Sequence, residues 1–110
     1  MKGFGEKNQS KKEKISKNKQ KVNTGQLIKK AFDLQAQGRK LEAAKFYKYL
    51  IKQGIEDYRV FSNYGIFLNE IGKHKESESK LQKAISLNPE YANAYYNLAV
   101  LFIGLGNFGK

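Results

Sequence analysis

The chain has 110 residues, of which 40% are hydrophobic and 28% are charged, so it has room for one small folded domain. It contains no cysteine, which excludes a disulfide framework, a thiolate nucleophile and a cysteine-type zinc site. No apolar run is long enough to span a bilayer, and the first 22 residues hold no signal-peptide core. We therefore expect a cytoplasmic protein.

The formal net charge of +11 is concentrated at the start of the chain. Residues 1–22 carry eight lysines against Glu6 and Glu13, a net charge of +6, and very few large apolar side chains. Such a segment buries too little surface to offset the entropy lost on ordering, so we predict a disordered basic tail over 1–22 and a folded domain over 23–110. The tail is either a solvated arm or a handle for the phosphates of nucleic acid, although it offers only Phe4 for stacking on bases.

Five amphipathic segments follow, each with apolar residues at helical spacing. The first helix follows the cap-type residues Asn23 to Gly25, and glycines are predicted to stop the first two helices. In chain order, the predicted helices run from Thr24 to a stop at Gly38, from Leu41 to a stop at Gly54, from Val60 to Ile71, from His74 to Leu87, and from Ala92 to Leu105. The fourth is closed by Asn88-Pro89, since proline cannot continue the hydrogen bonding of a helix. No period-two alternation indicates a strand.

The segments recur with a period of 34 residues. Gly38, Gly72 and Gly106 have this spacing, and small residues at 31, 65 and 99 repeat in phase with them. A single helical hairpin of this size cannot bury its apolar face, so such units stack on one another. We predict full repeats over 24–57 and 58–91 and a partial repeat over 92–110, which lacks its second helix.

The residue types within one period resemble the tetratricopeptide repeat (TPR). Its pattern of aromatic, small and proline positions is matched in the central repeat by Phe61, Tyr64, Gly65, Leu68, Ser77, Leu81, Ala84 and Pro89. The resemblance covers residues 24–110 and implies an all-α, helical-hairpin solenoid of about five helices. Small residues at positions such as 65 and 77 let two helices approach closely, so Gly65→Leu is expected to unfold the middle repeat.

The last helix has no partner helix after it in the sequence. We therefore expect it to expose Leu98, Leu101, Phe102 and Leu105 to water. Exposed apolar faces of this kind are covered by a partner, and self-association through this end is one hypothesis.

In proteins that this chain resembles, the first helix of each repeat lines a concave groove. By repeat position, the resemblance gives ten candidate groove residues in addition to Gln35. They are Ile28, Phe32, Arg59, Ser62, Ile66, Asn69, Asn93, Tyr96, Val100 and Ile103. This largely apolar lining suits an amphipathic helix or an extended peptide with apolar anchors. The family's clamp for a C-terminal carboxylate is matched only by Asn63, so we do not expect that specificity. Asn63 and Asn97 are predicted instead to brace neighbouring helices.

No constellation of residues predicts chemistry. His74, the single histidine, is predicted to be structural, and Glu56-Asp57 to form the start of the next helix. We therefore predict a non-catalytic protein-interaction adaptor or scaffold with no metal or other cofactor. Two alternatives stay open: the chain is the N-terminal part of a larger protein with a catalytic domain such as a transferase, or it is a basic helical-repeat binder of nucleic acid.

Overall fold

The computed structural model describes residues 24–106, and most of them are helical. The described chain is helical over residues 24–36 and then forms α2 (Lys40–Lys52), α3 (Tyr58–Glu70), α4 (His74–Leu87) and α5 (Ala92–Gly104). These residues contain no strand, and the predicted all-α helical-repeat fold is confirmed. The predicted tail over 1–22 and the end of the third repeat, 107–110, lie outside the described residues.

The helix ends follow from local chemistry. α4 has the predicted bounds, and α5 ends one residue earlier than predicted. α3 begins two residues before the predicted Val60, because Asp57 is its N-cap: the Asp57 carboxylate accepts a hydrogen bond from the backbone N–H of Arg59 at 2.9 Å. This bond satisfies one of the free N–H groups at the start of the helix. The negative charge of the carboxylate also suits the positive end of the helix, as predicted for Glu56-Asp57.

Glycine turns close the first helix of each full repeat. Gly38 and Gly72 have φ angles of 80° and 84°, in the left-handed region that other residues avoid. The residue after each glycine donates its N–H to the carbonyl five residues back, from Arg39 to Leu34 at 2.9 Å and from Lys73 to Leu68 at 2.8 Å. These bonds satisfy the last carbonyls of each helix and reverse the chain into the second helix of the hairpin.

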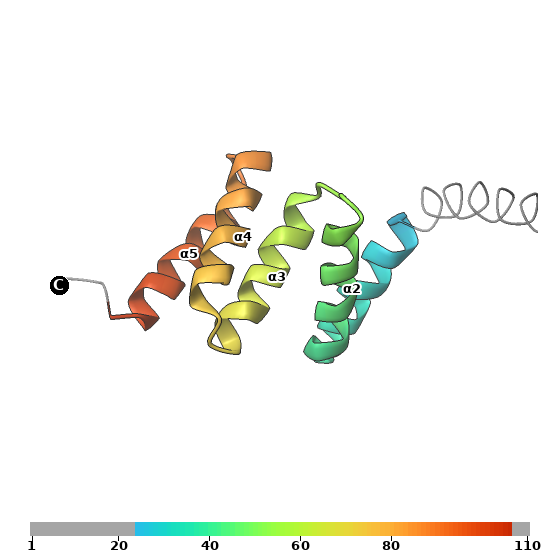
Figure 1. Cartoon of the computed structure of the whole chain (residues 1–110), viewed down its shortest axis with the longest axis horizontal. Helices are drawn as coiled ribbons and strands as arrows, with labels where there is room; N and C mark the ends of the chain where they lie inside the picture. Colours follow the sequence, from blue (N-terminus) through green and yellow to red (C-terminus); the bar gives the residue numbers. More distant parts are fainter. Residues whose placement is uncertain (1–23, 107–110) are drawn as a thin grey trace, which may run out of the picture.

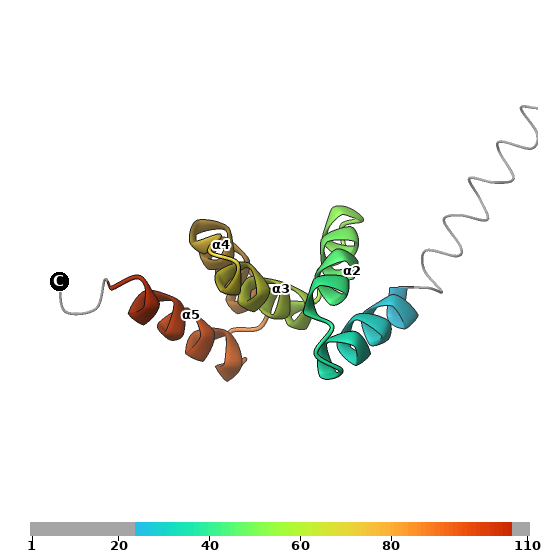
Figure 2. The same cartoon turned by 90° about the horizontal axis from the view of Figure 1, so that it is seen from below.

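The helices are arranged in two layers. Figure 1 shows α2, α3, α4 and α5 side by side in chain order. In the perpendicular view of Figure 2, the 24–36 helix, α3 and α5 lie on the lower side, and α2 and α4 lie on the upper side. The first helices of successive repeats therefore share one layer, and the second helices form the other.

The approach of α4 to α3 depends on Gly65, which is buried in the middle of α3. A Cβ atom built at this position would lie 2.9 Å from Leu81 Cγ and Cδ2, and 3.3 Å from the carbonyl oxygen of Ser77. The buried Ser77 hydroxyl donates to the carbonyl oxygen of Gly65 at 2.6 Å. The predicted role of these small residues in close helix packing is confirmed.

One apolar core runs through the first repeat and α3, and a smaller cluster joins α3, α4 and α5. The expectation that α5 exposes Leu101 was wrong: Leu101 is fully buried, because α5 packs against both α4 and α3. Leu98 and Phe102 are half-buried and Leu105 is exposed. Ala94 and Leu101, seven residues apart, mark the face of α5 that meets the array.

Candidate peptide-binding groove

The ten predicted groove residues lie on the helices of the lower layer in Figure 2. On α3 and on α5 they recur at the same spacing, so each set shares one face of its helix. Ile28, Phe32, Ile66 and Asn69 are half-buried, whereas Arg59, Asn93, Tyr96, Val100 and Ile103 are exposed. Only Ser62 is fully buried, so its side chain lies beneath the surface and does not line it.

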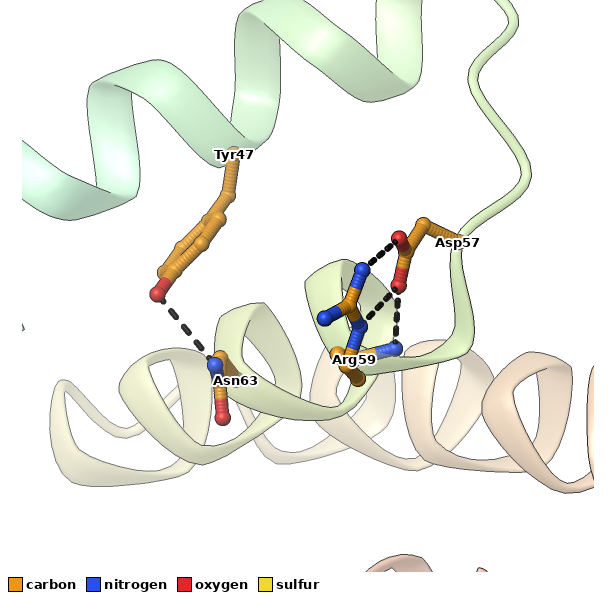
Figure 3. A network of polar contacts seen from close by, with 4 residues as sticks. All are labelled: Tyr47, Asp57, Arg59 and Asn63. Carbon is orange, nitrogen blue, oxygen red and sulfur yellow. Dashed lines mark hydrogen bonds and ion pairs between the residues drawn. The ribbon is translucent and has the colours of Figure 1, made fainter. Parts of the chain in front are cut away.

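Arg59 is held in place by its neighbours near the start of α3. Its guanidinium pairs with the Asp57 carboxylate, with Nη2 to Oδ2 at 2.6 Å and Nε to Oδ1 at 3.0 Å (Figure 3). The guanidinium carbon lies 5.2 Å from the centroid of the Phe32 ring, in cation–π contact across two repeats. This residue therefore presents a half-exposed positive group in a fixed position over an aromatic ring.

Arg59 also sets the ionisation of Asp57. Burial by itself raises the pKa of Asp57, but the hydrogen bonds from the guanidinium and backbone of Arg59 outweigh it and hold that pKa below its ordinary value. Asp57 is consequently charged at neutral pH, and it both caps α3 and orients Arg59.

A tyrosine from the other layer reaches the floor of the groove. Tyr47 of α2 is 1% exposed, and its hydroxyl accepts from Asn63 Nδ2 at 3.3 Å (Figure 3). The same hydroxyl donates to Gln35 Oε1. Burial raises the pKa of Tyr47 to about 12, so the hydroxyl keeps its proton at neutral pH. This network ties the 24–36 helix, α2 and α3 together.

The hydrogen bonding of the Tyr47 hydroxyl was not predicted from the sequence. There, Tyr47 was assigned only to an aromatic packing position. The available signal was the hydroxyl itself, since the corresponding position of the next repeat is Leu81 and has no polar atom. A buried tyrosine hydroxyl nearly always has a hydrogen-bond partner. Gln35 and Asn63, on two other helices, are its partners.

The predicted bracing by asparagine is confirmed at both positions. Asn63 joins α3 to α2 through Tyr47, and Asn97 Nδ2 of α5 lies 3.5 Å from Ser62 Oγ of α3. Ser62 thus serves as an acceptor between α3 and α5. At 3.5 Å, this contact is longer than a typical N–H···O hydrogen bond and is correspondingly weak.

Asn69 and His74 form a contact at the far end of α3. His74 Nδ1 lies 2.8 Å from Asn69 Oδ1, and because an amide oxygen only accepts, the imidazole donates. His74 therefore makes a contact between α4 and α3, and Asn69 is oriented by the first residue of α4.

The two halves of the groove differ in character. The half built by the 24–36 helix and α3 contains the Arg59 guanidinium and the hydrogen-bonded amides described above. The α5 half has no charged residue and exposes Tyr96 by 70% and Ile103 by 61%, with Val100 between them on the same face. One side of the surface therefore carries a fixed positive charge and hydrogen-bonded amides among its apolar residues, and the other side has no charge.

The described residues offer no cluster of three or more His, Cys, Asp or Glu side chains that could hold a metal ion. Across residues 24–106, no helix is long and apolar enough to cross a membrane.

Part of the chain matches a known protein family. A family profile described as TPR repeat matches residues 68–106, from the end of α3 through α4 and α5. No curated protein sequence matches the chain. TPR repeats are in general protein-protein interaction modules. The matched segment, the 34-residue spacing of the glycine turns and the two-layer stack of helical hairpins support a TPR-family protein.

Proposed function

We propose that this chain is a non-catalytic adaptor that holds an amphipathic helix or an extended peptide in the groove lined by the 24–36 helix, α3 and α5. The observation that supports this proposal is the row of apolar side chains on α5, Tyr96, Val100 and Ile103, beside the fixed Arg59 guanidinium over Phe32. Apolar side chains of a ligand would dock on α5, and a ligand carboxylate or carbonyl would meet Arg59.

The groove is organised before a ligand arrives. Asp57 orients Arg59, and His74 orients Asn69. The hydrogen bonds of Tyr47 hold the helices beneath the groove together. Side chains that are already ordered lose less conformational entropy on binding, so such a surface supports affinity without a large contact area.

The test is selection of peptides from a random library against the full chain, followed by measurement of Kd by calorimetry. Selected peptides should carry apolar anchors and lose about ten-fold or more in affinity on the double change Tyr96→Ala and Ile103→Ala. The control is Ile71→Ala, which truncates a side chain of similar exposure outside the groove. If the control weakens binding as much as the groove change, the groove is not the binding surface.

A second copy of the chain is the partner we propose for the other face of α5. On this end face, Tyr95 and Leu105 are exposed, and Leu98 and Phe102 are only half-buried. Because α5 has no charged residue, two such faces can meet without burying a charge. The end face and the groove face lie on different sides of α5, so both can be occupied together.

The two alternatives depend on residues outside the described range. The lysine-rich tail lies before residue 24, and a downstream catalytic domain would lie beyond the printed sequence. Among the residues that the structure describes, no observation favours either over the groove.

A further inference from the structure

A second surface lies on α2, on the side away from the groove. Its side chains are Leu41, Lys45, Lys48, Tyr49 and Lys52, whose spacing places them on one stripe of the helix. All five are exposed, Leu41 by 64% and Tyr49 by 47%, and the buried residues of α2 lie on the opposite side of the helix. α2 is in the upper layer of Figure 2, so this stripe does not belong to the groove.

Beside the stripe is a hollow of about 360 Å³ between α2 and the 24–36 helix. It is lined by Leu27, Lys45, Phe46 and Tyr49. Three of these four are apolar or aromatic, and Lys45 supplies the charge at the rim. The hollow is shallow and open to solvent, so it suits one protruding apolar side chain of a ligand rather than an enclosed small molecule.

The lysines of the stripe have no ion-pair partner among the described residues, and only Lys45 is attracted by a nearby carboxylate, that of Glu42. Lys45, Lys48 and Lys52 form no hydrogen bond or ion pair with any other described residue. The single acidic residue of α2, Glu42, is already held by Arg39 at 2.7 Å. Lysines three and four residues apart on one helix repel each other, so this arrangement contributes nothing to the stability of α2.

We propose that the hollow and the three lysines bind an acidic peptide segment that carries one bulky apolar side chain. The apolar side chain enters the hollow against Leu27, Phe46 and Tyr49, and the carboxylates pair with the lysines. Lys48 and Lys52 are separated by about 6 Å along the helix axis, close to the roughly 6.6 Å between alternate residues of an extended chain. Alternate acidic residues of such a peptide can therefore meet successive lysines.

A peptide fits this surface better than a membrane or a nucleic acid. A flat bilayer surface would leave the hollow between the two helices unfilled. The stripe contains lysines only, which act as point charges, and lacks the arginine fork that pairs with phosphate in two parallel hydrogen bonds. The proposal does not depend on the groove, and failure of one does not affect the other.

The test uses the full chain and a fluorescein-labelled peptide in which glutamate alternates with serine around one central phenylalanine. Binding is followed by fluorescence anisotropy. The triple change Lys45→Gln, Lys48→Gln and Lys52→Gln should weaken binding by about ten-fold, because three exposed ion pairs are lost. The matched control is Lys73→Gln, Lys75→Gln and Lys80→Gln, which lowers the net charge equally at or next to α4 and should change the affinity by less than about two-fold.

A second measurement tests the hollow. Replacing the phenylalanine of the peptide with serine should weaken binding to the unaltered chain, and should have little further effect on the Tyr49→Ser variant. Equal weakening by the two triple lysine variants would overturn the proposal, because binding would then follow net charge alone. Binding to phosphatidylserine vesicles that is lost in the α2 variant, without binding of the peptide, would also overturn it in favour of a membrane surface.

Discussion

At Gly65, a single missing side chain sets the distance between α3 and α4. The atoms that a Cβ would meet cannot retreat easily, since Leu81 is fully buried and the Ser77 carbonyl belongs to the backbone of α4. The sequence predicted this close approach, because small residues recur at the same place in each period. The hydrogen bond from Ser77 to Gly65 was visible only once the two helices were placed together.

Gly65→Ala should lower the free energy of unfolding by about 1 to 3 kcal/mol, despite the better helix propensity of alanine, because the added methyl group overpacks the contact with Leu81. Gly65→Leu should unfold the middle repeat. The control is Gly104→Ala, where the new Cβ meets no atom within 4 Å and the change should be neutral or stabilising. Urea unfolding followed by circular dichroism measures both, and equal stability of the two alanine variants would contradict the packing argument.

The sequence predicted the packing of the Tyr47 ring but not the hydrogen bonds of its hydroxyl. Its aromatic ring was predicted to fill a packing position, and it does so. Its hydroxyl bridges Gln35 and Asn63, which belong to two other helices. That bridge requires the side chains of three helices to converge, and no spacing within one helix contains this information.

At the scale of elements, α3 is the helix whose start was predicted least well. The apolar pattern begins at Val60, but the helix begins at Tyr58 because Asp57 caps it. Asp57 was predicted to favour the start of a helix, although its ion pair with Arg59 was not. This pair couples the helix start to the candidate groove, since the same carboxylate orients the guanidinium over Phe32.

The cap predicts an acid dependence of stability. The pKa of Asp57 is lower in the folded chain, so its contribution is fully present above the ordinary value of 3.8 and is lost as the pH falls through the lowered value. Asp57→Asn keeps a capping oxygen but removes the charge, and should flatten this part of the acid dependence. Asp57→Ala should cost about 1 kcal/mol at neutral pH.

Urea unfolding measured from neutral pH to below pH 3.8 provides the check. The matched control is Asp33→Asn, which removes an exposed carboxylate paired with Lys29 on the 24–36 helix. The interpretation fails if Asp57→Asn keeps the full acid dependence of the unaltered chain.

At the scale of the whole molecule, stability comes from contacts between neighbouring helices in the stack. α3 packs against α2, α4 and α5, whereas the main neighbours of α5 are α4 and α3. Six residues of α3 are buried but only two of α5, Ala94 and Leu101. In a repeat array, an added partner raises the stability of the unit with the fewest neighbours the most.

The chain should therefore associate through the end face of α5. Its mass, measured by sedimentation at tens of micromolar, should be that of a dimer, and the dimer should persist at high salt because apolar contacts are not screened. Ala99→Lys places a charge on this face and should give a monomer, whereas Asn93→Lys adds the same charge to an exposed position on the groove face of α5 and should not. A monomeric mass for the unaltered chain across this range would refute the dimer.

The sequence by itself determined the helices, their 34-residue period, the glycine turns at Gly38 and Gly72 and the small residues at helix contacts. These features are local: a left-handed turn, a cap or an apolar stripe depends on residues a few positions apart. The tertiary structure decided which faces are covered, burying Ser62 and Leu101 and leaving Leu41 and Tyr49 exposed beside unpaired lysines. Burial depends on which neighbouring helix packs over a face, and that neighbour comes from a distant part of the chain.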